Sequence, residues 1–249
     1  MPDPGDGVLD IRLGAHTIRE NLDRAVAAGH LTRHADGTLT IRESWPNWWI
    51  RFENAPHPPC KFLFYFLFRL AYGRAAVPYG CRDCYKVKVM PKDLRQTMAL
   101  KKLAEPVACR SKCGSEVDMP YSRNLWGGYF YTLGLDKARA IYREVRAAVD
   151  ADPVLGPDVP MLIKRGCTEY EIHCGPSDTY EVRPELADVE EYLKNVLRPF
   201  PNHVPQTRPE AQAVTLHWIA TAHRVGDETY TEFTDGRLAY RPPVTYDPE

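Results

Sequence analysis

The chain has 249 residues, of which 44% are hydrophobic and 26% charged, so it can build a packed core and wholesale disorder is excluded. Its 32 Lys and Arg residues and 33 Asp and Glu residues give a formal net charge of −1, so any attraction for a polyanion must be local. The most apolar run, Phe62 to Phe68, falls far short of the roughly 20 residues that span a bilayer, so no membrane partner is expected. The N-terminus lacks the pattern of a secretory signal, so we expect a cytoplasmic protein with few or no disulfides.

The N-terminal segment predicts a helix followed by a hairpin. A T-x-x-E capping box at residues 17–20 and apolar residues at helical spacing predict a helix over residues 18–28. An Asp-Gly pair in the middle of residues 31–42 predicts a β-hairpin, because this pair readily takes the positive φ angles of a tight turn. We therefore assign residues 1–43 to an N-terminal helix and hairpin.

The central region, residues 44–125, combines an aromatic segment with four of the cysteines. The ring-rich run predicts a buried helix over about residues 60–73. An alternating segment at residues 85–89 predicts a strand, and Pro91 marks the beginning of another helix. We expect this region to form an aromatic helix and a four-cysteine metal unit.

The remaining region, residues 126–249, predicts a C-terminal α+β region. A strand at 126–131, a helix at 135–149 and a strand from 161 to 174 suggest one βαβ crossover. The later pattern predicts helices over residues 186–196 and 207–222 and a hairpin over 229–240. The expected fold class is α+β, and the three regions can pack as one body.

The strongest chemical signal is a pair of cysteine motifs, Cys81-x-x-Cys84 and Cys109-x-x-x-Cys113. Two short Cys pairs can place four thiolates around one ion or cluster, because one turn presents two sulfurs. Three residues inside the second pair weaken the match to zinc knuckles, while iron–sulfur clusters tolerate varied spacing. The pattern slightly favours an iron–sulfur cluster such as 4Fe-4S over a zinc ion, and unligated thiols remain the alternative. Cys60 is interpreted as a small buried hydrophobe.

The segment 82–112 is locally basic, with nine Lys and Arg residues against three Asp and Glu residues. Such a surface can contact phosphate or an acidic partner, although a solvated helix face gives the same composition. The candidate anion-binding residues are Lys86, Lys88, Arg95, Lys164 and Arg165.

A second candidate site follows from the predicted extension of the strand to residue 174. In an extended segment, alternate residues share a face, which would collect a thiol, two carboxylates and an imidazole for general acid and base chemistry. These candidate catalytic residues are Cys167, Glu169, Glu171 and His173. The alternative is the solvated side of an ordinary strand.

These observations lead to two functional hypotheses. The first is an intracellular metalloprotein whose four cysteines hold an iron–sulfur cluster or a zinc ion, serving electron transfer or an associated enzymatic step with a redox partner. The second is a zinc-organised binding module whose basic 82–112 surface docks nucleic acid or an acidic protein. A metal-free interaction protein is a third possibility. Whether the chain is an enzyme stays open, because the common nucleotide-binding, P-loop, zincin and hydrolase motifs do not occur.

Overall fold

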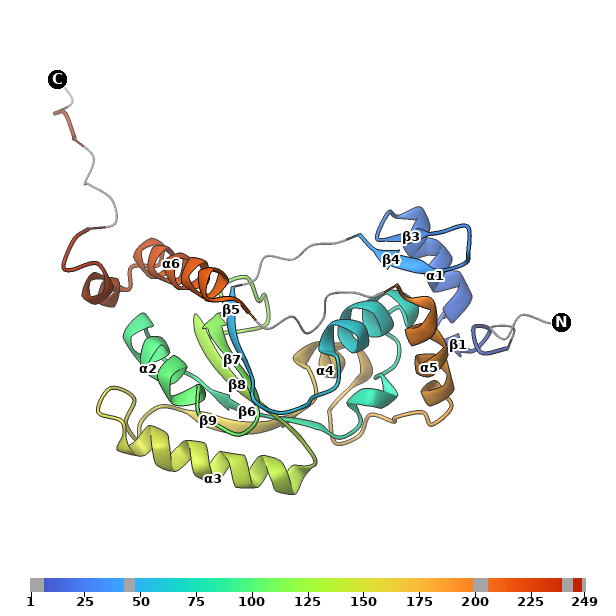
Figure 1. Cartoon of the computed structure of the whole chain (residues 1–249), viewed down its shortest axis with the longest axis horizontal. Coiled ribbons are helices and arrows are strands. Elements are labelled where there is room, and N and C mark those ends of the chain that lie inside the picture. Colours follow the sequence, from blue (N-terminus) through green and yellow to red (C-terminus); the bar gives the residue numbers. More distant parts are fainter. Residues whose placement is uncertain (1–6, 43–47, 199–205, 239–243, 248–249) are drawn as a thin grey trace.

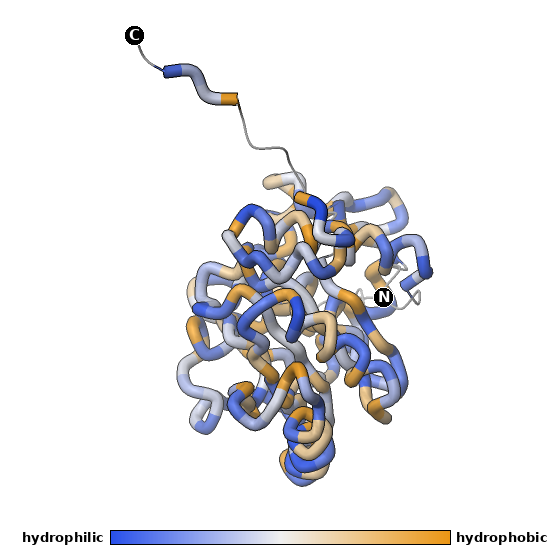
Figure 2. The backbone as a smooth tube through the Cα atoms, turned by 90° about the vertical axis from the view of Figure 1, so that its left-hand side faces the viewer, coloured by the Kyte–Doolittle hydropathy of each residue, from blue (hydrophilic) through white to orange (hydrophobic). Residues whose placement is uncertain are grey.

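The computed structural model describes residues 7–42, 48–198, 206–238 and 244–247. It shows a mixed α+β fold whose helices and strands surround two hydrophobic cores (Figure 1). Hydrophobic and hydrophilic stretches alternate along the chain (Figure 2), as expected where each element turns one side to a core. Among the described residues, no helix has the length and apolar character needed to cross a bilayer.

The N-terminal helix and hairpin are confirmed. The Thr17 hydroxyl accepts a hydrogen bond from the Glu20 N–H at 3.2 Å, and the Glu20 carboxylate accepts one from the Thr17 N–H at 2.8 Å. This capping box begins the helix where the sequence predicts it. The elements are β1 (Arg12–Leu13), β2 (His16–Thr17), α1 (Ile18–Ala27), β3 (Leu31–Arg33) and β4 (Leu39–Ile41).

The predicted aromatic helix is present, but it winds as the π-helix η1 (Lys61–Ala71). Phe66, Leu67 and Phe68 are fully buried in it and form the centre of the first core. This core draws side chains from all three predicted regions, because helices near both ends of the chain pack around η1. The helices that follow η1 in the chain and join the first core are η2 (Tyr79–Cys81), α4 (Thr168–Cys174) and α5 (Leu186–Val196).

A five-stranded sheet carries the second core on one face. Its order is β5-β7-β8-β6-β9, and every pairing is antiparallel. Helices α2, α3 and α6 cover one face, where Val87, Phe130 and Trp218 are buried together. The elements are β5 (Trp49–Glu53), β6 (Cys84–Val89), α2 (Leu94–Ala104), β7 (Arg110–Ser115), β8 (Trp126–Leu133), α3 (Leu135–Ala151), β9 (Met161–Arg165) and α6 (Arg208–Arg224).

The predicted βαβ crossover is wrong. Helix α3 joins β8 to β9, but β6 lies between these two strands and pairs antiparallel with both. The backbone N–H and C=O groups of β6 therefore form hydrogen bonds along both edges of the strand. Periodicity correctly predicts the strands and the helix, but it carries no information about which strands become neighbours.

Two segments predicted as strands are helical instead. Strand β9 ends at Arg165, Gly166 takes a φ of +61°, and α4 begins at Thr168, so the strand does not continue to residue 174. Near the C-terminus, the 3-10 helix η3 (Glu228–Phe233) replaces the first strand of the predicted 229–240 hairpin. The end of that hairpin lies outside the described residues. The helices predicted at 186–196 and 207–222 are confirmed as α5 and α6.

Candidate anion-binding face and thiol-lined cavity

The face of the sheet opposite α2, α3 and α6 is rich in cations, and we call it the basic face. Side chains alternate along a strand, so residues two apart project from the same face. Pairing places Arg51 opposite Lys112, and Lys86 opposite Lys164, which sets their side chains side by side. The cations of the basic face are Arg51 of β5, Arg110 and Lys112 of β7, Lys86 and Lys88 of β6, and Lys164 of β9.

Two tyrosines of the central strand β8 separate these cations. The Lys86 ammonium and the Arg110 guanidinium each lie 5.4 Å from the Tyr131 ring centroid. Around the Tyr129 ring, Lys88 and Lys112 lie at 5.4 and 5.2 Å. Cation–π attraction therefore holds like charges close together without neutralising them.

Carboxylates neutralise only part of the basic face. Glu53 pairs with Arg110 at 2.9 Å, and Glu171 pairs with Lys164 at 3.5 Å. A third carboxylate, Glu116, pairs with Lys88 at 2.9 Å. Across the ranges that the structure describes, the other cations form no salt bridge. These are Arg51, Lys86 and Lys112.

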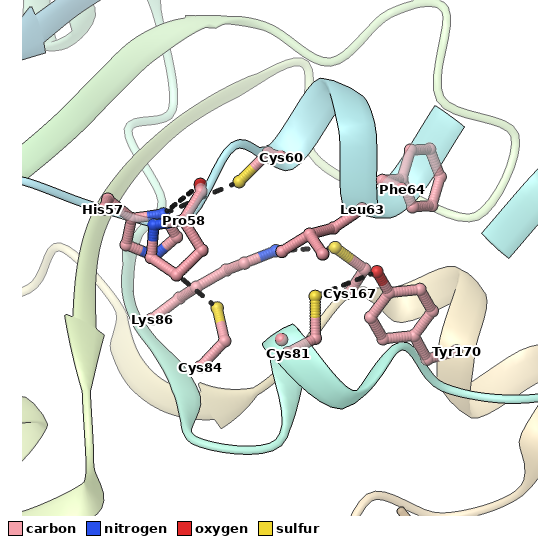
Figure 3. A pocket seen from close by; sticks show the side chains of 11 residues that line it. His57, Pro58, Cys60, Leu63, Phe64, Cys81, Cys84, Lys86, Cys167 and Tyr170 are labelled. Carbon is pink, nitrogen blue, oxygen red and sulfur yellow. Dashed lines mark hydrogen bonds between the residues drawn. The ribbon is translucent and has the colours of Figure 1, made fainter. Parts of the chain in front are cut away.

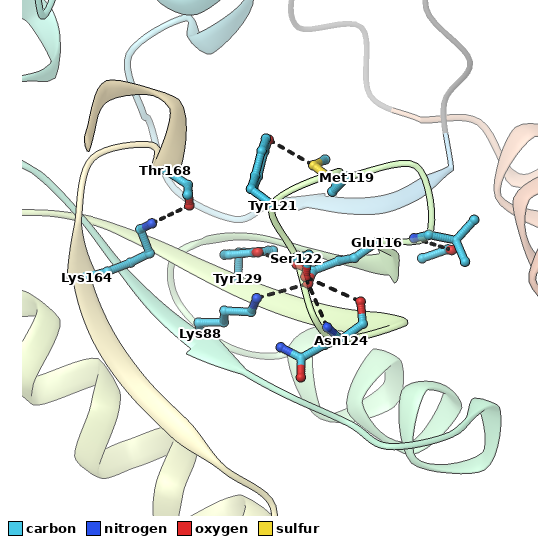
Figure 4. Close-up of polar contacts among 11 residues, drawn as sticks. Lys88, Glu116, Met119, Tyr121, Ser122, Asn124, Tyr129, Lys164 and Thr168 are labelled. Carbon is cyan, nitrogen blue, oxygen red and sulfur yellow. Dashed lines mark hydrogen bonds and ion pairs between the residues drawn. The ribbon is translucent and has the colours of Figure 1, made fainter. Parts of the chain in front are cut away.

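Glu116 fixes one border of the basic face. Its carboxylate is buried and receives Lys88, together with hydrogen bonds from the hydroxyls of Ser122 and Tyr129 (Figure 4). Gly127 makes room for it, since a Cβ there would lie 2.5 Å from a Glu116 carboxylate oxygen. This network ties the segment after β7 to the sheet and holds Lys88 in a closed ion pair.

The unneutralised charges perturb one another. Burial, followed by repulsion from Lys86 and Arg51, lowers the pKa of Lys112 from 10.5 to about 7. Burial and the charge of Lys86 also lower the pKa of Lys164. Buried like charges are unfavourable without a counter-charge, so a bound anion would stabilise this face.

A small thiol-lined cavity lies beside the basic face, between η1, η2, β6 and α4 (Figure 3). His57 is placed between two thiols, with Nδ1 3.7 Å from Cys60 Sγ and Nε2 3.8 Å from Cys84 Sγ. Lys86 Nζ donates a hydrogen bond to Cys167 Sγ at 3.1 Å. The free space is about 10 Å³, close to the least that admits one water. The thiols at the cavity are those of Cys60, Cys81, Cys84 and Cys167.

The four cysteines predicted to bind metal are not brought together. Cys81 belongs to the first core, whereas Cys109 and Cys113 belong to the second core on the covered face of the sheet. Cys84 has the strand parity of Lys86, so it projects toward the opposite face from Cys113. Burial raises the pKa of Cys113 to about 12, which favours the neutral thiol over the thiolate that metals bind.

No group of three or more His, Cys, Asp or Glu side chains in the described ranges is arranged to hold a metal ion. The donor set therefore does not fit an iron–sulfur cluster or a zinc ion. The physical reason is register: Cys84 of β6 projects to the face opposite Cys113 of β7. Cys81 lies in η2 within the first core, and Cys109 precedes β7 within the second.

The predicted catalytic residues do not share a face, because most of them lie on helix α4 rather than on a strand. Cys167 precedes α4 and lines the cavity, and the Glu169 carboxylate accepts a hydrogen bond from the Tyr121 hydroxyl at 2.5 Å. Glu171 pairs with Lys164, while the His173 ring lies 6.0 Å from the Phe68 ring in an edge contact. Residues two apart on a helix point in different directions, so no acid–base cluster forms.

Three of the five predicted anion-binding residues meet on the basic face, and two do not. Lys86, Lys88 and Lys164 lie together across β6 and β9. Arg95 lies on α2, where its side chain pairs with Glu232. Arg165 has the opposite strand parity, and its guanidinium donates a hydrogen bond to the Ser177 carbonyl at 2.8 Å.

The sequence did not point to Arg51, and Arg110 and Lys112 were counted in the basic 82–112 surface without being singled out as binding residues, because β5 and β7 were not predicted as strands. The signal was present, since Arg110 and Lys112 are two residues apart between the cysteines, and residues 49–53 alternate. The assignment of Cys60 as a plain hydrophobe also missed its contact with Arg110, which the fold creates across 50 residues.

Searches of family models, curated proteins and solved structures found no match to this chain.

Proposed function

We propose that this protein binds a single strand of nucleic acid on the basic face, through the phosphate backbone. The observation that supports this most directly is the pair of Arg51 and Lys112, which are partly exposed on one sheet face without a carboxylate partner among the described residues. Lys86, only 7% exposed, adds buried positive charge to the same face. Phosphates would supply the missing counter-charges, and the release of bound counterions would drive association.

The layout of the cations favours an extended ligand over a single compact anion. Pairing aligns them in two rows across the sheet. One row runs from Arg51 through Lys112 to Lys88, from β5 to β6, and the other runs from Arg110 through Lys86 to Lys164, from β7 to β9. Each row covers three strand spacings, or about 14 Å, which suits a chain of several phosphates.

The aromatic residues of this face support backbone contacts rather than reading of bases. Trp49 and Tyr131 are only 8% and 9% exposed, so their rings are not available to stack on bases. They pack beneath the cations instead. Binding should therefore be insensitive to base sequence.

The four-cysteine iron–sulfur or zinc site, with its electron-transfer role, is not carried forward, because the thiols lie on opposite sides of the sheet. Docking of an acidic protein, the other form of the basic-surface hypothesis, becomes an outcome of the binding test.

The test is fluorescence anisotropy with a labelled oligothymidylate of about 20 nucleotides, in buffers from about 50 to 200 mM salt. Saturable binding that weakens with salt and is equal for an oligomer of mixed sequence is the expected result. A polyglutamate peptide of similar length serves as the competing acidic ligand. Preferential binding of polyglutamate, or no binding of either ligand at 50 mM salt, would overturn the proposal.

A further inference from the structure

Cys60 has an electrostatic environment different from that of the other cavity thiols. It lies at the N-terminal end of η1, is only partly buried, and lines the thiol cavity. Arg110 donates a hydrogen bond from Nη1 to Cys60 Sγ at 3.2 Å, and His57 Nδ1 lies 3.7 Å away. A guanidinium at this distance stabilises a thiolate, and the N-terminal end of a helix adds to the effect.

Charges from several elements face the Cys60 sulfur. Burial opposes its ionisation, but the His57 hydrogen bond and the positive charges of Arg110 and Lys86 outweigh burial and lower the pKa of Cys60 from 9.0 to about 6. Burial instead raises the pKa of Cys84 to about 12. The titratable groups around Cys60 are His57 from its own segment, Arg110 from β7, Lys86 and Cys84 from β6, Tyr131 from β8, Cys81 from η2, and Cys167 before α4.

We propose that Cys60 is a nucleophilic thiolate that reacts with hydrogen peroxide and is oxidised to a sulfenic acid, a role separate from ligand binding on the basic face. The Cys60 sulfur attacks one peroxide oxygen, so an S–O bond forms while the O–O bond breaks. The sulfur loses two electrons, and the departing hydroxide takes a proton from solvent to become water. Arg110 and Lys86 offset the negative charge that develops on the leaving oxygen.

The size of the cavity restricts the oxidant. Free space of about 10 Å³ beside Cys60 is close to the least that admits one water, which excludes bulky organic hydroperoxides and favours the smallest peroxide. Hydrogen peroxide is therefore the probe of choice.

The experiment exposes the full-length protein to hydrogen peroxide, stops the reaction with catalase, and denatures the chain in dimedone before peptide mass mapping. Oxidation of Cys60 is counted as a dimedone adduct or as a disulfide to another cavity cysteine. Cys174, a partly exposed thiol whose pKa burial raises, is the comparison within the same sample. At pH 7 Cys60 should be oxidised at least about tenfold faster than Cys174, following the thiolate fractions.

Two variants distinguish activation of the Cys60 thiol by neighbouring charges from simple exposure of this thiol to solvent. Arg110→Gln removes the guanidinium, so the midpoint of the pH–rate profile should shift upward from about 6, with a slower rate at pH 7. Arg82→Gln removes a half-exposed arginine that pairs with Asp83 and is not among the charges that lower the pKa of Cys60, and it should leave the profile unchanged. Equal oxidation of Cys60 and Cys174, or an unchanged midpoint in folded Arg110→Gln, would overturn the proposal. Folding is checked by circular dichroism.

Discussion

Replacing Lys112 with Gln tests the proposed binding face at one of its unneutralised cations. The side chain lies 3.8 Å from the Trp49 ring and forms no salt bridge with any described residue. Gln removes the charge and keeps a polar side chain that is one atom shorter. Because no carboxylate loses its partner, the main effect should fall on the anionic ligand rather than on the fold.

The size of the effect follows from the number of phosphates neutralised. For single strands, the slope of log affinity against log salt is about −0.7 per phosphate contacted. Arg51 and Lys112 are the partly exposed cations without a carboxylate partner, and together they predict a slope of about −1.4, so affinity should fall about sevenfold between about 50 and 200 mM salt. With Lys112→Gln the slope should become about −0.7 and the fall about 2.6-fold.

The assay is anisotropy with labelled oligothymidylate at pH 6.5, where Lys112 of the free protein carries its charge. Lys102→Gln is the matched control, since Lys102 is exposed on α2, which covers the opposite face of the sheet. It should leave the slope at the wild-type value. The reasoning is refuted if Lys112→Gln keeps the wild-type slope, or if both variants reduce it equally.

Further predictions concern pH, metal content and stability. Because burial and neighbouring cations lower the pKa of Lys112 to about 7, affinity for the oligonucleotide should fall several-fold from pH 6.5 to 8.5, and Lys112→Gln should abolish this dependence. In the unfolded chain Lys112 has its ordinary pKa of 10.5, so above pH 7 the unfolded state binds the Lys112 proton more tightly than the folded state does. The free energy of unfolding, measured in urea, should therefore rise above pH 7 by up to about 1.4 kcal/mol per pH unit. A profile that stays flat above pH 7 would contradict the lowered pKa of Lys112. Elemental analysis of protein purified without oxygen should find far less than one iron or zinc site per chain, and a stoichiometric amount would contradict the separation of the thiols. Glu190 accepts hydrogen bonds from the N–H groups of Tyr79 and Gly80 at 2.5 and 2.9 Å, so Glu190→Ala should lower the free energy of unfolding by about 3 kcal/mol. The exposed neighbour Glu191 is the control, and Glu191→Ala should change the free energy of unfolding little. Equal effects of the two variants in denaturant titrations would contradict the structural role of Glu190.

Local interactions made much of the secondary structure predictable. The capping boxes at residues 17–20 and 207–210 act over three residues, so α1 and α6 begin where the sequence indicates. The prediction failed after β9, where Gly166 adopts a positive φ and α4 follows. Alternation in a segment that short is compatible with either a strand or a helix, and the packing of Tyr170 into the first core accompanies the helical state.

The sequence by itself determined the α+β class, most helices, the N-terminal hairpin and the alternation that places Lys86 and Lys88 on one face. Only the tertiary structure decided that β6 lies between β8 and β9, which excludes the βαβ crossover. It also decided that the two Cys motifs face opposite sides of the sheet. The physical reason is that strand pairing and register depend on packing between distant segments, and a shift of one residue reverses every face. The meeting of Cys60 with Arg110, like that of Arg51 with Lys112, is a product of this long-range register and not of any local motif.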